Sequence, residues 1–277
     1  MTLVPGDIFL GTPGYRESTR VAVGGIPKGG LAPGKTYSLL SESGVVGELI
    51  GGTSHAKTFL GKAKYLGHVT DGTGEGMTIG QFSIRPARGA SDHGAPVYLV
   101  VGTSAEVGKT TAGVAVLKTL LKQGHDAVTV LKATGTASIA EIMTYRDRGA
   151  MSVFDFVDFG LPSTYPSKRP GINRVFDRAL DHCLCEPADA VLIECGGDML
   201  AANIPAFLRQ LRKRRRNAKV VLVAADALGA LGGARMLRAM GLRLDLVTGP
   251  CTDTPALRQR TEALCRSPAL NLAPKTS

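Results

Sequence analysis

The stretch that most constrains the fold runs from Val97 to Gly124 and reads VYLVVGTSAEVGKTTAGVAVLKTLLKQG. It opens with an apolar, largely β-branched run, Val97 to Val101, which predicts a buried strand. After Lys109, apolar residues recur at spacings of three and four, which predicts a helix that begins near this lysine and ends before Gly124. The chain therefore passes here from a strand through a short loop into a helix.

The loop ends in Gly108, Lys109 and Thr110, the second half of the phosphate-binding signature in which a glycine and four residues precede Gly-Lys-Ser/Thr. The first half departs from the signature, because Thr103 stands where the opening glycine is expected. In such a loop the backbone amides and the helix N-terminus bind phosphate, the lysine contacts the terminal phosphates and the hydroxyl ligates Mg²⁺. The alternative is a plain strand-to-helix turn that uses glycine for its backbone freedom.

The segment from Gly102 to Thr110, GTSAEVGKT, resembles the phosphate loop of the dethiobiotin synthetase family, which reads Gly-Thr-x-x-Glu-Val-Gly-Lys-Thr. That family belongs to a wider group of P-loop proteins that includes the cobyric acid synthases and the MinD-like ATPases. The resemblance continues in order from Val97 to the C-terminus. It implies ATP and Mg²⁺ as cofactors. The residues it places around the nucleotide are Thr103, Ser104, Ala105, Glu106, Val107, Gly108, Lys109, Thr110 and Thr111.

Residues 1–95 are rich in glycine, which separates short apolar runs. This pattern predicts a small β-rich domain. The expected strands are Arg20 to Val23, Thr36 to Leu40, Val45 to Ile50, Lys64 to Val69 and Met77 to Ile84. A polar linker, residues 85–95, follows them.

From Pro96 onward strands alternate with helices, so residues 96–277 predict an α/β domain with a parallel P-loop sheet and helices on both faces. The strands expected after the first one are Ala127 to Leu131, Ala190 to Glu194, Val220 to Ala224 and Leu244 to Val247. The helices expected after the first one end near Arg146, Cys185, Arg216 and Met240, and the last of them begins at Gly233.

Ligands of such sheets bind beyond the carboxyl ends of the strands, so we searched these ends for chemistry. Lys132 stands at the end of the second strand, before a loop of small residues that reaches Ser138 and could hold an anion. Thr136 or Ser138 could also cap the helix that follows. Glu194 ends a buried strand, where Mg²⁺ is the usual partner of a carboxylate in a P-loop fold.

Two further sites are implied by the resemblance. Asp147 matches a magnesium ligand of the family, although it could equally form a surface ion pair with its arginine neighbours. Asp155 and Asp158, in the segment FDFVDFGLPSTYP, are alternative metal ligands or substrate contacts. Thr248 and Pro250 lie where the family binds the adenine base, and Thr248 replaces an asparagine there.

The chain carries a formal net charge of +10, which makes anionic partners plausible. Much of the excess lies between Arg209 and Arg216. We interpret this cluster as a solvated last helical turn rather than a nucleic-acid site, because no aromatic residues interleave with the charges. The N-terminus lacks a signal sequence and no apolar run could span a membrane, so we expect a cytoplasmic protein, with no membrane partner.

These features predict an enzyme that transfers a phosphoryl group from ATP, with Mg²⁺, to a small anionic metabolite, as a kinase or a carboxylate-activating ligase. Lys109, Lys132 and Glu194 would be its catalytic residues, and Thr110, Asp147 and Glu194 would hold the metal. We also expect a homodimer. Two alternatives remain: a MinD-like switch ATPase, and a nucleic-acid kinase that uses the basic cluster.

Overall fold

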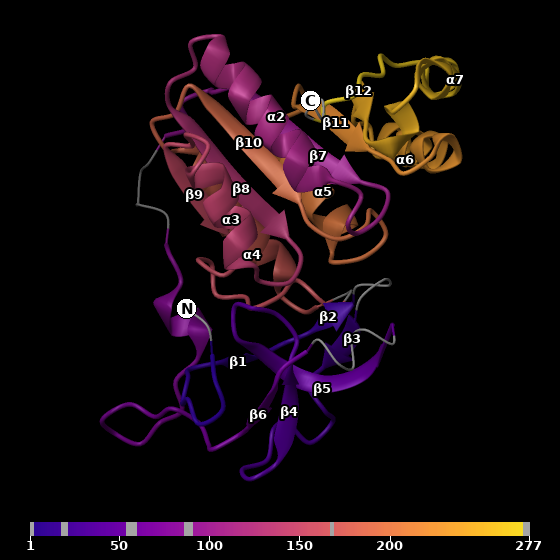
Figure 1. Cartoon of the computed structure of the whole chain (residues 1–277). Helices are drawn as coiled ribbons and strands as arrows, with labels where there is room; N and C mark the ends of the chain where they lie inside the picture. The colour runs from indigo at the N-terminus through magenta and orange to yellow at the C-terminus, as the bar shows by residue number, and fades with distance from the viewer. Residues whose placement is uncertain (1–2, 18–21, 54–59, 86–90, 167–168, 274–277) are drawn as a thin grey trace.

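The structure is a computed structural model, and it describes residues 3–17, 22–53, 60–85, 91–166 and 169–273. The fold is α/β: a six-stranded parallel sheet is flanked by helices, and a separate, mostly antiparallel sheet precedes it. Figure 1 shows the two sheets as distinct bodies, with the N-terminal sheet (indigo and purple) below the carboxyl ends of the parallel strands. The predicted fold class is confirmed.

The parallel sheet has the spatial order β12-β11-β7-β10-β8-β9. All of its neighbouring strands run parallel, so their carboxyl ends meet at one edge. The strand that precedes the phosphate loop, β7, lies at the centre of this edge. The strands are β7 (Val97–Gly102), β8 (Val128–Thr134), β9 (Ser152–Asp155), β10 (Ala190–Cys195), β11 (Lys219–Val223) and β12 (Leu244–Thr248).

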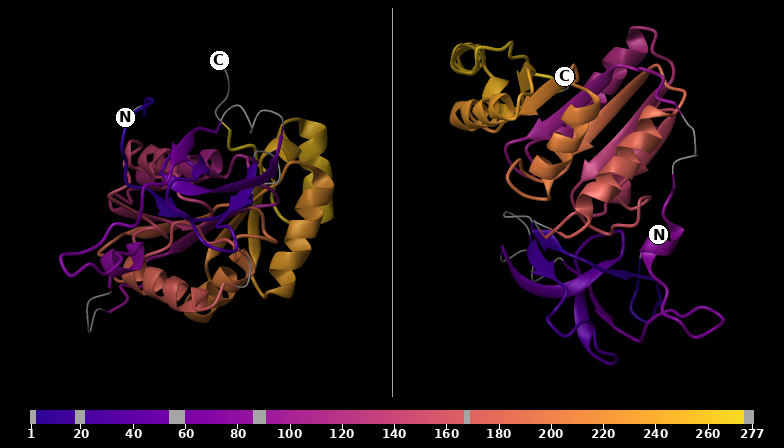
Figure 2. Two further views of the ribbon diagram at one scale, coloured as in Figure 1. Left: turned by 90° about the horizontal axis from the view of Figure 1, so that it is seen from below. Right: turned by 180° about the vertical axis from the view of Figure 1, so that it is seen from behind.

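Helices cover both faces of this sheet. The helices are α2 (Lys109–Lys122), α3 (Ile139–Arg146), α4 (Ile172–Leu184), α5 (Ile204–Arg214), α6 (Ala227–Ala239) and α7 (Pro255–Cys265), with a 3₁₀ turn, η2 (Pro250–Thr252), before α7. Figure 1 shows α2 and α3 in front of the sheet, and the right panel of Figure 2 shows α4 and α5 covering its other face.

The core is divided by the sheet into two clusters, because successive strand residues point to opposite faces. In β7, Leu99 packs in the cluster that contains Phe176 of α4 and Phe207 of α5. The next residue, Val100, packs in the cluster that contains Leu117 of α2. Because β7 is buried on both faces, its sequence is a continuous apolar run, and this run made the strand predictable.

The N-terminal sheet is built from short strands. These are β1 (Thr12–Pro13), β2 (Arg16–Glu17), β3 (Ala22–Gly25), β4 (Thr36–Leu39), β5 (Val45–Gly52) and β6 (Lys62–Lys64). Their order is β2-β3-β5-β4-β6, and β1 pairs with β5 in parallel. Part of the expected first strand and part of the expected linker lie outside the described residues.

Two predicted strands of this region were wrong. Only Lys64 of the expected strand Lys64 to Val69 is in β6, an edge strand, and Leu66 and Val69 beyond it are exposed rather than buried. The segment Met77 to Ile84 contains a 3₁₀ turn, η1 (Ile79–Phe82), because the Gln81 side chain accepts a hydrogen bond from the backbone of Thr78. A segment in which apolar and polar residues alternate does not form a strand when no neighbouring strand pairs with it.

Differences in the α/β part are smaller. The second strand extends to Thr134, so Lys132 lies inside β8 rather than at its end. The sequence reading missed β9 and α7, and it started α6 too late. The side chain of Asp226 accepts a hydrogen bond from Gly229 N–H and caps α6, and Thr254 caps α7 in the same way.

Contacts join the two parts of the chain. Leu40 and Val45 of the N-terminal part belong to the same core cluster as Phe159. Ile84 N–H donates to Asp158 O at 2.7 Å. The division into domains 1–95 and 96–277 stays a prediction.

The basic cluster ends α5. Its Arg214 forms ion pairs with Asp177 and Asp181 of α4, so this arginine packs two helices together. Arg215 pairs with Asp92. Within the described residues, no helix has the length and apolar character needed to cross a membrane.

Candidate functional site

The phosphate loop takes a tight conformation between β7 and α2. Gly108, at the N-cap of α2, has φ 92°, and Glu106 has φ 60°. A Cβ on Gly102 would lie 2.7 Å from Lys109 Cδ and 2.8 Å from Val107 Cγ1. Glycine is therefore required at position 102, because the loop approaches the end of the strand closely there.

Lys109 lies across this loop. It is buried, and its Nζ donates a hydrogen bond to Ser104 O at 2.8 Å. Burial lowers the pKa of Lys109, while the negative charge of Glu194 acts in the opposite direction. A lysine folded onto the rim of an amide-lined loop can neutralise a phosphate bound there.

Thr110 and Glu194 meet beside the lysine. Thr110 Oγ1 donates to Glu194 Oε1 at 3.2 Å, and the Tyr145 hydroxyl donates to Glu194 Oε2 at 2.5 Å. Glu194 is only 1% exposed, so these hydrogen bonds stabilise a carboxylate away from solvent. Burial raises the pKa of Tyr145 well above its usual value, which keeps the hydroxyl protonated as a donor.

The sequence analysis missed Tyr145. The tyrosine reaches Glu194 over a glycine of α2, since a Cβ on Gly113 would lie 2.0 Å from the Tyr145 hydroxyl oxygen. A glycine inside an amphipathic helix signals such a close approach, but it does not say which residue approaches.

Thr110 and Glu194 fit a magnesium ion that also binds nucleotide phosphates. Among the described residues, no group of three or more His, Cys, Asp or Glu side chains could hold a metal by itself. Mg²⁺ in nucleotide sites is held by one or two protein oxygens, with phosphate and water oxygens completing its shell. One hydroxyl and one carboxylate side by side are the donors that such a site needs.

Lys132 lies on β8, next to β10, and is 2% exposed. It forms an ion pair with Glu141 of α3. Burial lowers the pKa of Lys132. The backbone just after β10 passes close by, because a Cβ on Gly196 would lie 2.4 Å from Thr134 O and 3.1 Å from Lys132 Cε. The lysine is therefore held by its own protein rather than presented to solvent.

The loop after β8 is engaged as well. Gly135 N–H donates to Thr164 Oγ1 at 2.9 Å, and Thr136 Oγ1 donates to Tyr15 O at 3.1 Å. Ser138 is the N-cap residue of α3, but its hydroxyl donates to Glu42 instead of accepting from the helix. The N-terminal part supplies that cap: Ser43 Oγ accepts from Ile139 N–H at 2.8 Å.

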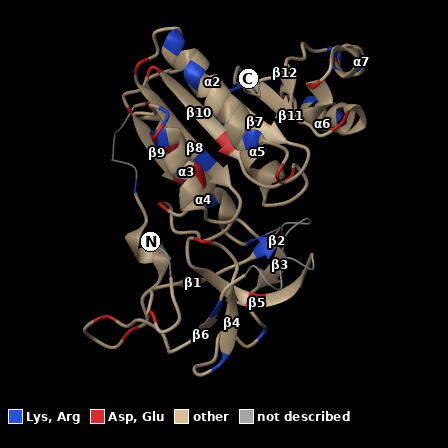
Figure 3. Cartoon of the chain, viewed as in Figure 1, with Lys and Arg blue, Asp and Glu red and all other residues tan. Residues whose placement is uncertain are grey.

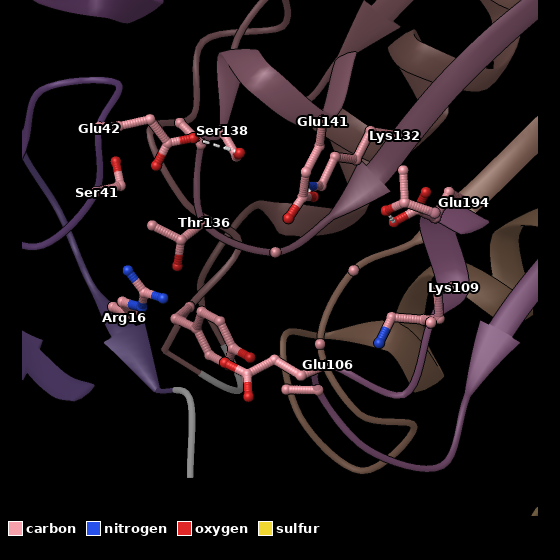
Figure 4. Close-up of a pocket in the computed structure, with 18 of the residues that line it drawn as sticks. Arg16, Ser41, Glu42, Glu106, Lys109, Lys132, Thr136, Ser138, Glu141 and Glu194 are labelled. Carbon is pink, nitrogen blue, oxygen red and sulfur yellow. Dashed lines mark hydrogen bonds and ion pairs between the residues drawn. The ribbon is translucent and has the colours of Figure 1, made fainter. Parts of the chain in front are cut away.

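These groups surround one cavity of about 330 Å³, shown in Figure 4. The phosphate loop and α2 contribute Ala105, Glu106, Gly108, Lys109, Thr110 and Thr111; the sheet edge and neighbouring loops contribute Lys132, Gly135, Thr136, Ala137, Ser138, Glu141, Tyr165, Glu194, Gly196 and Gly197; the N-terminal part contributes Arg16, Ser41 and Glu42. Figure 3 shows basic and acidic positions close together where β8, α3 and β10 meet. The N-terminal contribution was missed by the sequence analysis.

The structure does not bring every predicted site residue to this cavity. Asp147 is exposed at the C-cap of α3. Thr248 is buried at the end of the edge strand β12, where its Oγ1 accepts from Leu272 N–H, and Pro250 begins the turn that follows. Asp155 is buried on β9 opposite Lys132 in the register. None of these four is among the residues that line the cavity.

Three residues of the phosphate loop also do not line the cavity. Val107 is buried, Ser104 presents its carbonyl to Lys109, and Thr103 N–H donates to Val223 O at 3.0 Å. These three residues hold the loop in its conformation and do not contribute to the surface of the cavity.

Several solved structures that resemble the chain come from the signal recognition particle system. Chloroplast FtsY from Physcomitrella patens is 15% identical, with a TM-score of 0.45, over 69% of this chain and 62% of that one. FtsY from Thermotoga maritima is 22% identical, with a TM-score of 0.42, over 69% and 66%. The 54 kDa signal recognition particle protein from Aeropyrum pernix, in complex with GDP, is 15% identical, with a TM-score of 0.42, over 66% and 43%. The chain thus spans less than two thirds of the length of each of these neighbours.

The chain has an α/β fold in which a phosphate-loop sequence connects the central parallel strand β7 to α2. No protein-family model and no curated protein matches its sequence. The resemblance to dethiobiotin synthetase is not shown by any of these comparisons.

The predicted kinase or ligase acting on a small anionic metabolite was wrong. The structural neighbours are described as signal recognition particle proteins and their receptors, and not as enzymes that phosphorylate or ligate metabolites. The physical reason lies at Lys132, on which the prediction depended. This lysine is paired with Glu141, and the loop that was expected to receive an acceptor is bonded to Tyr15 and Glu42.

Proposed function

We propose that the chain binds a nucleoside triphosphate with Mg²⁺ at this cavity and hydrolyses it. The observation that carries the proposal is the grouping of Lys109, Thr110 and Glu194 at the start of α2 and the end of β10. The hydroxyl and the carboxylate would hold Mg²⁺, which supplies charge neutralisation to the phosphates when bound. The lysine and the amides of the phosphate loop would bind the phosphate oxygens.

Water is the acceptor that this proposal requires. Polar groups of the loop after β8 are hydrogen-bonded within the chain, so a small nucleophile fits this side of the cavity better than a second metabolite. Catalysis would consist of positioning and electrostatic stabilisation by Lys109 and its neighbours, without a covalent intermediate. A cytoplasmic location and a homodimer remain predictions from the sequence.

The test compares Lys109→Ala with Lys118→Ala, since both lysines belong to α2 and Lys118 is exposed. Hydrolysis of ATP and of GTP is measured separately, with Mg²⁺, as phosphate release. We expect the Lys109 variant to lose roughly 100-fold or more of the rate with the preferred nucleotide, and the Lys118 variant to retain it. Equal rates in the Lys109 variant and the parent, or no hydrolysis of either nucleotide by the parent, would overturn the proposal.

A further inference from the structure

A third cation faces the cavity from the N-terminal part of the chain. Arg16 lies on β2 and lines the same cavity as Lys109 and Lys132. In Figure 4 the guanidinium of Arg16 lies across the cavity from Lys109, beside Thr136. Three cationic residues that are far apart in the sequence thus line one cavity.

Arg16 is held in place by its own sheet. One guanidinium nitrogen, Nη1, donates to Leu40 O at 2.6 Å, and Leu40 is fully buried. The strand β2 pairs with β3 through Arg16 and Gly24. The preceding residue, Tyr15, accepts a hydrogen bond from Thr136 Oγ1 through its carbonyl. These bonds set the position of Arg16 relative to the phosphate loop, so the side chain does not have to be ordered when a ligand binds.

Three of the four acidic residues that line the cavity have partners of their own, while Glu106 of the phosphate loop is exposed and forms no ion pair among the described residues. Glu194 accepts from Thr110 and Tyr145. Glu141 pairs with Lys132, and Glu42 accepts from Ser138.

The hydrogen bond of Arg16 goes instead to a neutral carbonyl, and among the described residues the ion pairs do not include it. Because Arg16 lines the cavity and its guanidinium is not neutralised by an ion pair, its positive charge lies close to an anion bound there.

We propose that Arg16 contacts the terminal phosphate of the bound nucleotide and stabilises the charge that develops on it during hydrolysis. The N-terminal sheet thereby completes the catalytic site. The inference rests on the proposed function and adds a residue to it. A guanidinium suits this role because it is planar, stays charged and can donate two hydrogen bonds to one phosphate group.

In the hydrolysis, the oxygen of water forms a bond to the terminal phosphorus, and the bond from that phosphorus to the bridging oxygen breaks. The bridging oxygen keeps the electron pair and becomes a terminal oxygen of the nucleoside diphosphate. Inorganic phosphate leaves, and the remaining proton of the reaction passes to solvent. Negative charge accumulates on the bridging and terminal oxygens, where Arg16 on one side and Lys109 on the other would neutralise it.

The experiment replaces Arg16 by Gln, which is neutral but can still donate a hydrogen bond to Leu40 O, and by Lys, which keeps the charge. The matched control is Arg85→Gln, at an exposed arginine of the N-terminal part that does not line the cavity. The full chain is used throughout. Circular dichroism and thermal unfolding show whether each variant keeps the fold.

Two quantities are measured: the hydrolysis rate at saturating nucleotide, and the dissociation constants of the diphosphate and of a non-hydrolysable triphosphate analogue. We expect Arg16→Gln to lower the rate roughly 100-fold or more and to lose the preference for triphosphate over diphosphate, with diphosphate affinity unchanged. Arg16→Lys should retain part of the hydrolysis rate and part of the preference for triphosphate. Arg85→Gln should match the parent in both quantities.

A folded Arg16→Gln chain that hydrolyses and discriminates like the parent would overturn the inference. If Lys109→Ala had meanwhile lost its activity, the proposed function would still stand. An Arg16→Gln chain that does not fold leaves the test to Arg16→Lys: parental values in that variant, whose ammonium cannot make the paired contacts of a guanidinium, would also overturn it.

Discussion

Thr110 donates a hydrogen bond to Glu194 at 3.2 Å, although the two residues are 84 positions apart in the chain. The first residue of this pair lies at the start of α2 and the second near the end of β10. The two elements are adjacent because β10 pairs directly with β7, the strand that leads into the phosphate loop. Their contact joins the two halves of the proposed magnesium site.

Removing the charge of Glu194 should weaken metal binding. Glu194→Gln keeps the size of the side chain, but an amide is a poorer ligand for Mg²⁺ than a carboxylate. We expect the Mg²⁺ concentration for half-maximal hydrolysis to rise about tenfold or more, and Glu75→Gln, at an exposed site, to leave it unchanged. An unchanged Mg²⁺ titration in the Glu194 variant would assign this residue a structural role.

Adding a methyl group to Gly113 should destabilise the protein. The new Cβ would lie 2.0 Å from the Tyr145 hydroxyl oxygen, so the tyrosine must move away from Glu194. Gly113→Ala should lower the free energy of unfolding by about 1–3 kcal/mol. Gly232→Ala, on α6 with open space around its Cβ, should raise it by up to about 1 kcal/mol. Urea unfolding of both variants checks this, and a stabilised Gly113→Ala would show that the tyrosine moves without cost.

Asp155 should make stability depend on pH. Burial first, and the charge of Asp158 second, raise the pKa of Asp155 from 3.8 to about 6 in the folded chain. Between these values the folded state binds more protons than the unfolded state, so this carboxyl lowers stability as the pH rises toward 6. Its contribution is therefore unfavourable at neutral pH.

The variant Asp155→Asn removes this titration and keeps an oxygen that can accept from Val157 N–H. We expect its free energy of unfolding, relative to the parent, to increase from pH 4 to pH 7 by on the order of 2 kcal/mol. Asp126→Asn, at an exposed site, serves as control. Parallel pH profiles for parent and Asp155 variant would contradict the assignment.

A fragment that begins at Gly94 tests the proposed domain boundary. The parallel sheet and its helices are complete from β7 onward, so the fragment should fold. It should be less stable than the full chain, because Leu40 and Val45 no longer cover their neighbours in the core. Thermal unfolding monitored by circular dichroism measures the difference. A fragment without a cooperative transition would place the boundary elsewhere.

The elements that the sequence predicted best are those whose signal lies within a short window. The strand Val97–Gly102 is an uninterrupted apolar run, and α2 begins at Lys109 as its apolar spacing indicates. The sequence analysis did not identify the caps Asp226 and Thr254, so it began α6 too late and missed α7, although each capping bond spans only three residues. The strand Met77 to Ile84 failed because its alternation needed a partner strand that the fold does not provide.

The phosphate loop, its lysine and the carboxylate of Glu194 followed from the sequence alone, since loop chemistry and strand ends are local properties. Only the tertiary structure decided what surrounds them. Tyr145 reaches Glu194 because α3 packs against α2 at a glycine. Lys132 forms an ion pair because Glu141 of α3 lies next to it. Arg16 faces the cavity because the N-terminal sheet docks on the loop after β8. Such contacts depend on how separate elements pack together, and the residue pattern within one element does not identify the element that packs against it.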